Sequence, residues 1–249
     1  MTITSGLGQA FYLGGYDLSG DTGSADNISS PLNTQDITAI SGRAVRRLGL
    51  LRDGAISWMS YFNPALAAAH SVLSTLPTTD RHLMWATGST LGNPAACMVG
   101  KQIGYDGTRA QDGSFTLKVD AQANAYGLEW CQLLTAGQRT DTTATNGTSL
   151  DLGAGSTTFG LQAYLQVLSF TGTSCTIALQ ESSDNGAGDA FAAVTGGAFT
   201  AVTAAPQAQR IQTARTQTVE RYLRVATTGT FSNIVFLVAV NRNPVAVNF

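Results

Sequence analysis

The heptapeptide SFTLKVD, residues 114–120, decides the fold of this chain, because apolar Phe, Leu and Val alternate strictly with Ser, Thr, Lys and Asp. Successive side chains of a β-strand point to opposite faces, so this period of two predicts a strand with one buried and one solvated face. The turn signal Asp112-Gly113 precedes it and follows an expected strand at 95–105, which predicts a β-hairpin. The alternation of small and bulky residues at 55–62 predicts a further strand.

One helix is expected beside these strands, over residues 65–76. Asn63 is a good N-cap, and Pro64 suits the first helical position, where no amide hydrogen is needed. Pro77 would end the helix. The spacing of 3, 4 and 3 residues places four apolar side chains on one face: Leu66, Ala69, Leu73 and Leu76.

The C-terminal part shows only β patterns. Residues 161–167 and 175–179 alternate in polarity, and 234–240 is a continuous apolar run that fits a central strand. Short strands with Gly-rich turns indicate a β-sandwich. The predicted fold class is therefore mainly β, with one flanking α-helix and a second β-sandwich domain.

Two stretches rich in Gly, Ser, Thr and Asn interrupt these patterns. Residues 14–34 predict a long loop, of the kind that is functional or docks against a partner. The other stretch, at 137–157, predicts an interdomain linker. The expected domains are therefore 1–140 and 158–249, joined by a linker at 141–157.

Composition narrows the function classes. The chain has 249 residues, of which 43% are hydrophobic and 12% charged, with 14 Lys and Arg against 16 Asp and Glu. A protein that coats DNA needs clustered basic residues, so the net charge of −2 disfavours that class. Few charges together with 27 Gly suggest a surface that other copies of the chain cover.

The sequence offers no recognisable catalytic, cofactor-binding or metal-binding constellation. His70 and His82 lack partners at ligand spacing, and nucleophile and phosphate-cradle motifs are absent. Three cysteines without CxxC spacing, Cys97, Cys131 and Cys175, are expected to be buried thiols. One basic cluster exists: Arg43, Arg46, Arg47 and Arg52. Contacts between subunits, to carboxylates, are the favoured reading of this cluster, and nucleic-acid binding is the alternative.

Three stretches resemble the major tail (tail tube) proteins of long-tailed bacteriophages, especially actinobacterial siphophages. The first is RRLGLLRDG at 46–54, leading through 58–62 into the expected helix. The second is GSTLGNPAA at 88–96 with KQIGYD at 101–106. The third runs from Asp112 through YGLEW at 126–130 to GQRTD at 137–141. The resemblance covers roughly residues 10–141, and the C-terminal part is more loosely similar to an extra β-domain on the tube exterior.

This resemblance implies a β-sandwich or barrel-like fold with one flanking helix. It also implies a non-enzymatic structural virion protein without cofactors, assembled in the host cytoplasm. Copies would form stacked hexameric rings and contact other tail proteins. The resulting hollow tube would pass the genomic DNA without binding it specifically and without a membrane partner.

A lumen for DNA should be neutral or negative, because basic surfaces bind phosphate. We therefore expect the polar face of 114–120 to line it, with Asp106, Asp112, Lys118 and Asp120 as lumen-facing candidates. An alternative function is a virion-surface binding module, in which the C-terminal sandwich attaches to glycans or the host surface through Tyr164, Phe170 and Tyr222. A hydrolase ranks last.

Overall fold

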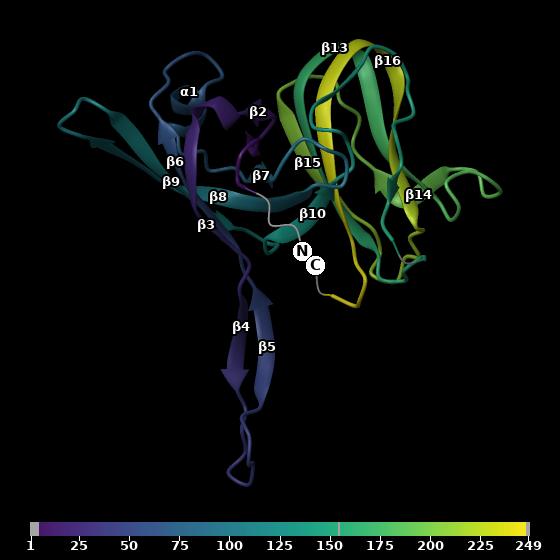
Figure 1. The fold of residues 1–249 in the computed structure, drawn as a ribbon, viewed down its shortest axis with the longest axis horizontal. Coiled ribbons are helices and arrows are strands. Elements are labelled where there is room, and N and C mark those ends of the chain that lie inside the picture. Colours follow the sequence, from purple (N-terminus) through teal and green to yellow (C-terminus); the bar gives the residue numbers. More distant parts are fainter. Residues whose placement is uncertain (1–4, 154, 248–249) are drawn as a thin grey trace. The chain divides into compact units, whose positions relative to one another are not determined.

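The computed structural model describes residues 5–153 and 155–247 and confirms a mainly β chain with antiparallel sheets (Figure 1). The chain forms two compact units. The first unit consists of the chain up to Gly20, Arg81–Cys97 and the chain from Trp130 onward. The second unit consists of Asp21–Asp80 and Met98–Glu129. These units do not coincide with the expected 1–140 and 158–249 domains.

The second unit is built on four antiparallel strands in the order β3 (Thr22–Ser29), β6 (Ala55–Tyr61), β9 (Phe115–Ala123) and the outer part of β8 (Pro94–Arg109). β8 begins in the first unit and continues into the second. β8 and β9 form the predicted hairpin, in which Tyr105 lies opposite Val119. The alternation of 114–120 is confirmed, because Leu117 and Val119 are buried while Lys118 between them is exposed.

Helix α1 (Ala69–Leu73) covers the buried face of these strands. Gln102 and Tyr105 share this face with Val119; the Gln102 amide donates to the Leu73 carbonyl at 2.8 Å, and Tyr105 Oη lies 2.9 Å from His70 Nδ1. The expected helix over 65–76 is too long, and its ends are wrong. Two of the four residues assigned to its apolar face, Leu66 and Leu76, are exposed.

The shortening of the helix has a local cause. Ala67 has a φ of 62°, which no right-handed helix accommodates, so the segment before α1 turns outward. Leu66, expected on the buried face, is 95% exposed, and Leu76 is 46% exposed. Ala69 and Leu73 are buried as predicted. Asn63 accepts the Ala65 amide hydrogen at 3.1 Å and so caps this outward turn rather than a helix.

A long two-stranded arm leaves the four-stranded sheet between β3 and β6 (Figure 1). It comprises residues 31–53, with β4 (Leu32–Asp36) paired to β5 (Arg47–Arg52) in a sheet of its own. The expectation of a long loop at 14–34 is therefore wrong. That stretch contains β2 (Tyr16–Asp17), a 3-10 turn (Ser19–Asp21), β3 and most of β4. Backbone pairing makes these residues strands although their side chains have low β propensity.

The first unit contains the remaining strands. They are β1 (Ala10–Leu13), β7 (Arg81–Ala86), β10 (Glu129–Leu133), β11 (Arg139–Asp141), β12 (Leu150–Asp151), β13 (Leu161–Ser182), β14 (Ala192–Ala198), β15 (Gln207–Gln212) and β16 (Tyr222–Arg242). β13 and β16 pair antiparallel along almost their whole length. The run 234–240 lies within β16, which also pairs with β10, β11 and β12, so its central position is confirmed. Aliphatic side chains from β13 and β16, with Val194 and Phe199, form the core.

The segment 141–157 packs on β16 along much of its length. β11 and β12 pair with β16, and isolated bridges join Asn146 to Ala226 and Thr157 to Val219. The segment therefore belongs to the first unit and has fixed partners, unlike a flexible linker.

Candidate functional site

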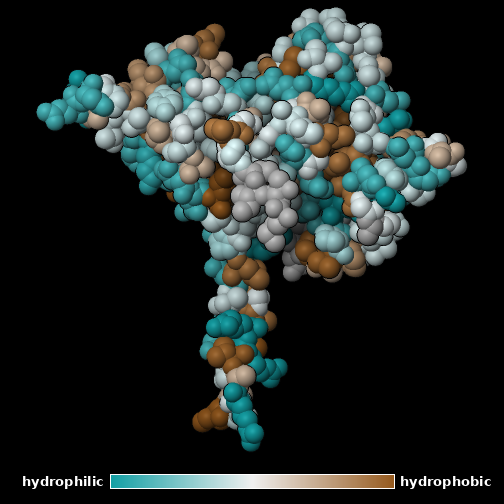
Figure 2. All heavy atoms as spheres, in the orientation of Figure 1, coloured by the Kyte–Doolittle hydropathy of each residue, from teal (hydrophilic) through white to brown (hydrophobic). Residues whose placement is uncertain are grey.

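The arm is the most exposed apolar feature of the second unit. Every described residue from Ser30 to Asp53 is exposed, and Figure 2 shows hydrophobic side chains along the arm. Ile40 at its tip is fully exposed, and Leu51 is 80% exposed. The large apolar residues on the arm are Leu32, Ile37, Ile40, Val45, Leu48, Leu50 and Leu51. So many exposed large apolar side chains on one hairpin indicate an interaction site.

The four arginines of the predicted basic cluster all lie on this arm. Arg43 and Arg46 lie in the tip, and Arg47 and Arg52 lie at the two ends of β5. The tip is itself ordered by hydrogen bonds: the Asp36 carboxylate accepts from the Thr38 amide at 2.8 Å, and the Arg46 amide donates to Thr38 Oγ1 at 2.8 Å. The arm thus presents guanidinium groups and aliphatic side chains together on a shaped hairpin.

Sequence reasoning identified the arginines and missed the leucines and isoleucines around them. A strand buried on one face alternates in polarity, but the arm is exposed on both faces and carries apolar residues on each, so no period of two is visible. The run RLGLLR at 47–52 was the available signal: three leucines flanked by arginines, beside a turn.

The second surface is the face of the four-stranded sheet opposite α1, which we call the open face. Asp106 lies directly opposite Lys118 in the β8–β9 register, and Lys118 Nζ lies 3.6 Å from Asp120 Oδ2. Ser57 of β6 lies opposite Asp120 and extends this polar row. Three of the four lumen-facing candidates, Asp106, Lys118 and Asp120, are therefore together on one face. Their charges sum to −1.

The fourth candidate, Asp112, lies in the turn between β8 and β9, away from that row. Its carboxylate accepts the Ser114 amide hydrogen at 2.9 Å and the Ser114 hydroxyl hydrogen at 2.8 Å. These hydrogen bonds lower the pKa of Asp112 and favour its ionised form. The residue is a turn former at the tip of the hairpin.

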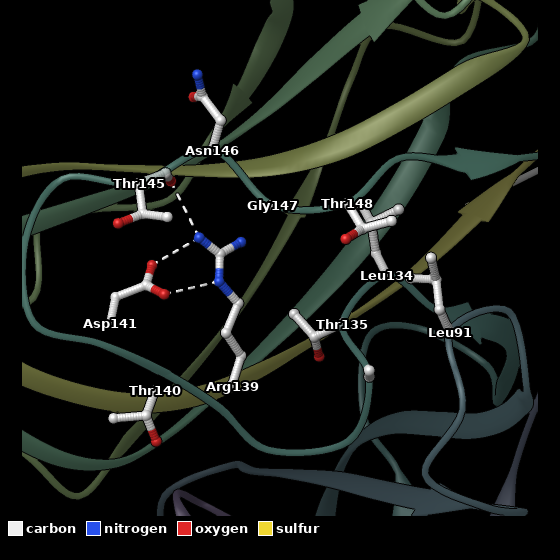
Figure 3. A pocket seen from close by; sticks show the side chains of 11 residues that line it. Leu91, Leu134, Thr135, Arg139, Thr140, Asp141, Thr145, Asn146, Gly147 and Thr148 are labelled. Atoms are coloured by element: carbon white, nitrogen blue, oxygen red, sulfur yellow. Dashed lines mark hydrogen bonds and ion pairs between the residues drawn. The ribbon is translucent and has the colours of Figure 1, made fainter.

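A cavity of about 420 Å³ lies in the first unit, beside Arg139 (Figure 3). Arg139 donates to both carboxylate oxygens of Asp141, at 2.8 and 2.7 Å, and to the carbonyls of Val225 and Thr145, each at 3.0 Å. Gly147 passes so close that a Cβ there would lie 2.2 Å from an Arg139 nitrogen. These bonds engage all three guanidinium nitrogens within the chain. The ion pair therefore holds the 141–157 segment on β16 and leaves no charge aimed at a ligand.

Other chemistry-bearing residues have structural partners. No group of three His, Cys, Asp or Glu residues placed to hold a metal occurs within 5–153 and 155–247. Over the same described ranges, no helix is long and apolar enough to cross a membrane. All three cysteines are buried, as predicted, and none forms a disulfide; burial raises the pKa of Cys175 to about 11. The thiol of Cys175 is thus held in its unreactive form.

The aromatic residues considered for glycan stacking do not form a platform. Tyr164 is completely buried, and its hydroxyl accepts from Arg210 at 3.2 Å. Phe170 packs partly buried against the core of the first unit, and Tyr222 stacks beneath Arg221 with the ring centroid 5.0 Å away. Tyr164 is therefore a core residue, and the alternative in which it stacks on a sugar does not hold for it.

No protein-family model matches the sequence, and no curated protein matches it significantly. Solved structures similar to the chain include the tail of an empty GTA particle with C6 symmetry, at 13% identity and a TM-score of 0.36, covering 44% of this chain and 81% of that one. A second is the SPP1 Dit protein, a hub of the adsorption apparatus in phages that infect Gram-positive hosts; it is 10% identical, with a TM-score of 0.33, and the match covers 94% of this chain and 99% of that one. A third is the activated phage p2 baseplate with Sr; it is 9% identical, with a TM-score of 0.35, and the match covers 94% of this chain and 98% of that one.

Proposed function

We propose that this chain is a structural subunit of a bacteriophage tail that assembles into stacked hexameric rings, forming the hollow tube through which the genome passes. The observation that carries the proposal is the pair of outer edges on the four-stranded sheet. Within the described residues, β3 pairs with β6 alone; β8 pairs with β7, β10 and β9, and its outer stretch from Gly104 to Arg109 is in register with β9. Exposed edges offer unpaired N–H and C=O groups to a neighbouring strand.

The directions of the two edge strands allow the edge of one copy to pair with the opposite edge of another. Neighbouring strands alternate in direction across β3, β6, β9 and β8, so the two edge strands run antiparallel to each other. The β8 edge of one copy can therefore form an antiparallel ladder with the β3 edge of the next. Repeating this heterologous contact around an axis closes a ring. The sixfold number comes from the resemblance to tail tube proteins.

In such a ring the open face lines the lumen, and α1 lies outside it. Asp106, Lys118 and Asp120 would then face the passing DNA with one cation against two anions. A lumen of this balance neutralises few phosphates and releases few counterions, so DNA can pass without adhering. Asp112 would lie at the rim.

The arm supports the same assignment, because a lone subunit leaves its apolar residues in water. Arg43, Arg46 and Arg47 are exposed on it, which suits contacts to carboxylates of another subunit. Contacts between rings would bury the arm, and the sheet edges would serve contacts within a ring.

Purified full-length protein should form tubes with a central channel in negative-stain micrographs, and end-on views should show sixfold rings. Their length should rise with protein concentration, and double-stranded DNA should not be retarded by them in a gel. Particles that remain monomeric in light scattering at every concentration and salt tested, also in the presence of preformed tail initiators, would contradict the proposal.

A further inference from the structure

An exposed apolar surface lies at the end of β6 opposite the arm. Phe62 is 41% exposed, Phe115 is 40% exposed and Leu66 is 95% exposed. The Phe62 ring lies 5.1 Å from that of Phe115 and 4.8 Å from that of His70, measured between centroids. We call Phe62, Leu66, His70, Tyr105 and Phe115 the aromatic patch.

The patch is held in shape by the chain rather than being a frayed end. The Asp21 carboxylate accepts from the Asn63 side-chain amide at 2.8 Å and from the Ala69 backbone amide at 2.9 Å. These two bonds fasten both ends of the turn that carries Leu66. Leu66 is thus presented outward by a loop that hydrogen bonds fix, in the turn between Phe62 and His70.

Arm and patch belong to the same compact unit and lie at opposite ends of one strand. The arm joins β6 just before Ala55, and Phe62 directly follows Tyr61 at its other end. A strand rises about 3.3 Å per residue, so roughly 20 Å of β6 separates the two surfaces. Copies placed one after another along this direction bring the arm of one toward the patch of the next.

We propose that the aromatic patch is the docking site for the arm tip of a second copy of this chain. The inference rests on the proposed function and specifies which surface receives the arm. Both surfaces expose large apolar side chains, and burying one against the other removes both from water. The contact joins two different surfaces, so it repeats without closing and extends a stack.

Charge favours the same occupant. Residues 31–53 of the arm carry four arginines and two aspartates, whereas the β8–β9 tip beside the patch, residues 104–114, carries two aspartates and one arginine. A net +2 arm therefore approaches a net −1 rim. Exposed Asp112, in the turn at this tip, is within the segment that an arginine of the docked arm tip would meet.

Disulfide trapping tests the contact directly, because the three native cysteines are buried. Three arm variants, Ile37→Cys, Ile40→Cys and Val45→Cys, are each mixed with Leu66→Cys under assembly conditions and oxidised. At least one mixture should give a covalent dimer on non-reducing gels, at a yield several-fold above that of either variant alone. The matched control replaces Leu66→Cys with Ser183→Cys, an exposed position in the first unit, and should give only background dimer.

A second variant measures the same contact without oxidation. Leu66→Asp should leave the melting temperature unchanged, because Leu66 touches solvent in the lone subunit, and should raise the critical concentration for assembly about tenfold or more. Tubes that form with no dimer from any arm variant and with an unchanged Leu66→Asp critical concentration would overturn the docking site and leave the tube function standing. A chain that never polymerises would overturn both.

Discussion

Two ion pairs of the first unit have nearly the same geometry and very different exposure, and they make a matched test of what fixes residues 139–151. Arg139 and Asp141 form a bidentate pair whose side chains are 15% and 4% exposed. Arg221 and Asp151 form a bidentate pair whose side chains are 41% and 42% exposed. Thr227 also donates its hydroxyl to Asp141, at 2.7 Å. Asp151 also accepts the Gly153 amide hydrogen at 2.9 Å, but at an exposed position, so the hydrogen-bond network of the first pair is the buried one.

The perturbation is Asp141→Asn, which removes the charge and leaves the buried Arg139 guanidinium without its counterion. Breaking a buried pair in this way costs about 3–5 kcal/mol. For a chain of this length each kcal/mol moves the melting temperature by about 2–4 °C, so the expected loss is roughly 6–20 °C.

Asp151→Asn is the control, because exposed ion pairs contribute little to folding. The assay is thermal unfolding followed by circular dichroism at pH 7, with both variants at the same protein concentration. Equal melting temperatures for the two variants would refute the conclusion that the Arg139 network holds this segment on β16. A loss confined to the Asp141 variant would also distinguish the segment from a free linker.

Three further outcomes are expected. Gln166→Met should lower the melting temperature by roughly 5–10 °C, because it leaves the buried Gly15 amide, 2.7 Å from Gln166 Oε1, and the His82 carbonyl without this partner. Glu181→Gln should raise the urea midpoint at pH 7 and leave it unchanged at pH 4. Burial raises the pKa of Glu181 in the folded state, so its ionised form destabilises the fold as the pH rises through the folded-state pKa, and the glutamine removes that cost. Exposed arm charges act only between copies, so Arg43→Glu with Arg47→Glu should abolish tubes in micrographs while the monomer melts normally.

For each of these three predictions, a control or a contrary result can be named. Gln132→Met, on an exposed strand position, is the control for Gln166→Met and should change little. A pH-independent gain from Glu181→Gln would show that packing, not ionisation, sets its effect. Arginine variants that assemble as the wild type does would remove the arm charges from the interface.

The sequence predicted those parts of the fold in which one strand face is buried and the other is wet. In residues 114–120 the alternation of apolar and polar side chains predicts which strand face is buried, and the turn Asp112-Gly113 before them predicts the hairpin. β3 could not be found in this way, because its polar residues are held by backbone bonds to β6, a partner about thirty residues away. The same limit hid the packing of 141–157, where Asp141 is buried through a long-range network with Thr227.

The sequence predicted the charge of the candidate site but not its shape. The basic cluster could be read from four nearby arginines, but its placement on an arm depends on β4 and β5 leaving the main sheet as a separate pair. The outward Leu66 likewise depends on a positive φ at Ala67, an alanine that helix propensity places inside the helix. Helix propensity therefore gave the wrong conformation for the turn that carries Leu66 of the aromatic patch.

The turn before α1 replaces a helix that the local sequence would favour. A helix continuing from Ala65 through Leu76 would have turned Leu66 toward the core and satisfied its amides internally. The observed turn instead uses Asp21 to satisfy the Ala69 amide and places a leucine in water. Proteins keep such locally unfavourable arrangements where the surrounding structure enforces them, and these cluster at functional positions. Asp21→Asn, which weakens both bonds of the turn, should therefore reduce assembly more than it reduces monomer stability; an equal loss of both would make the turn a folding feature only.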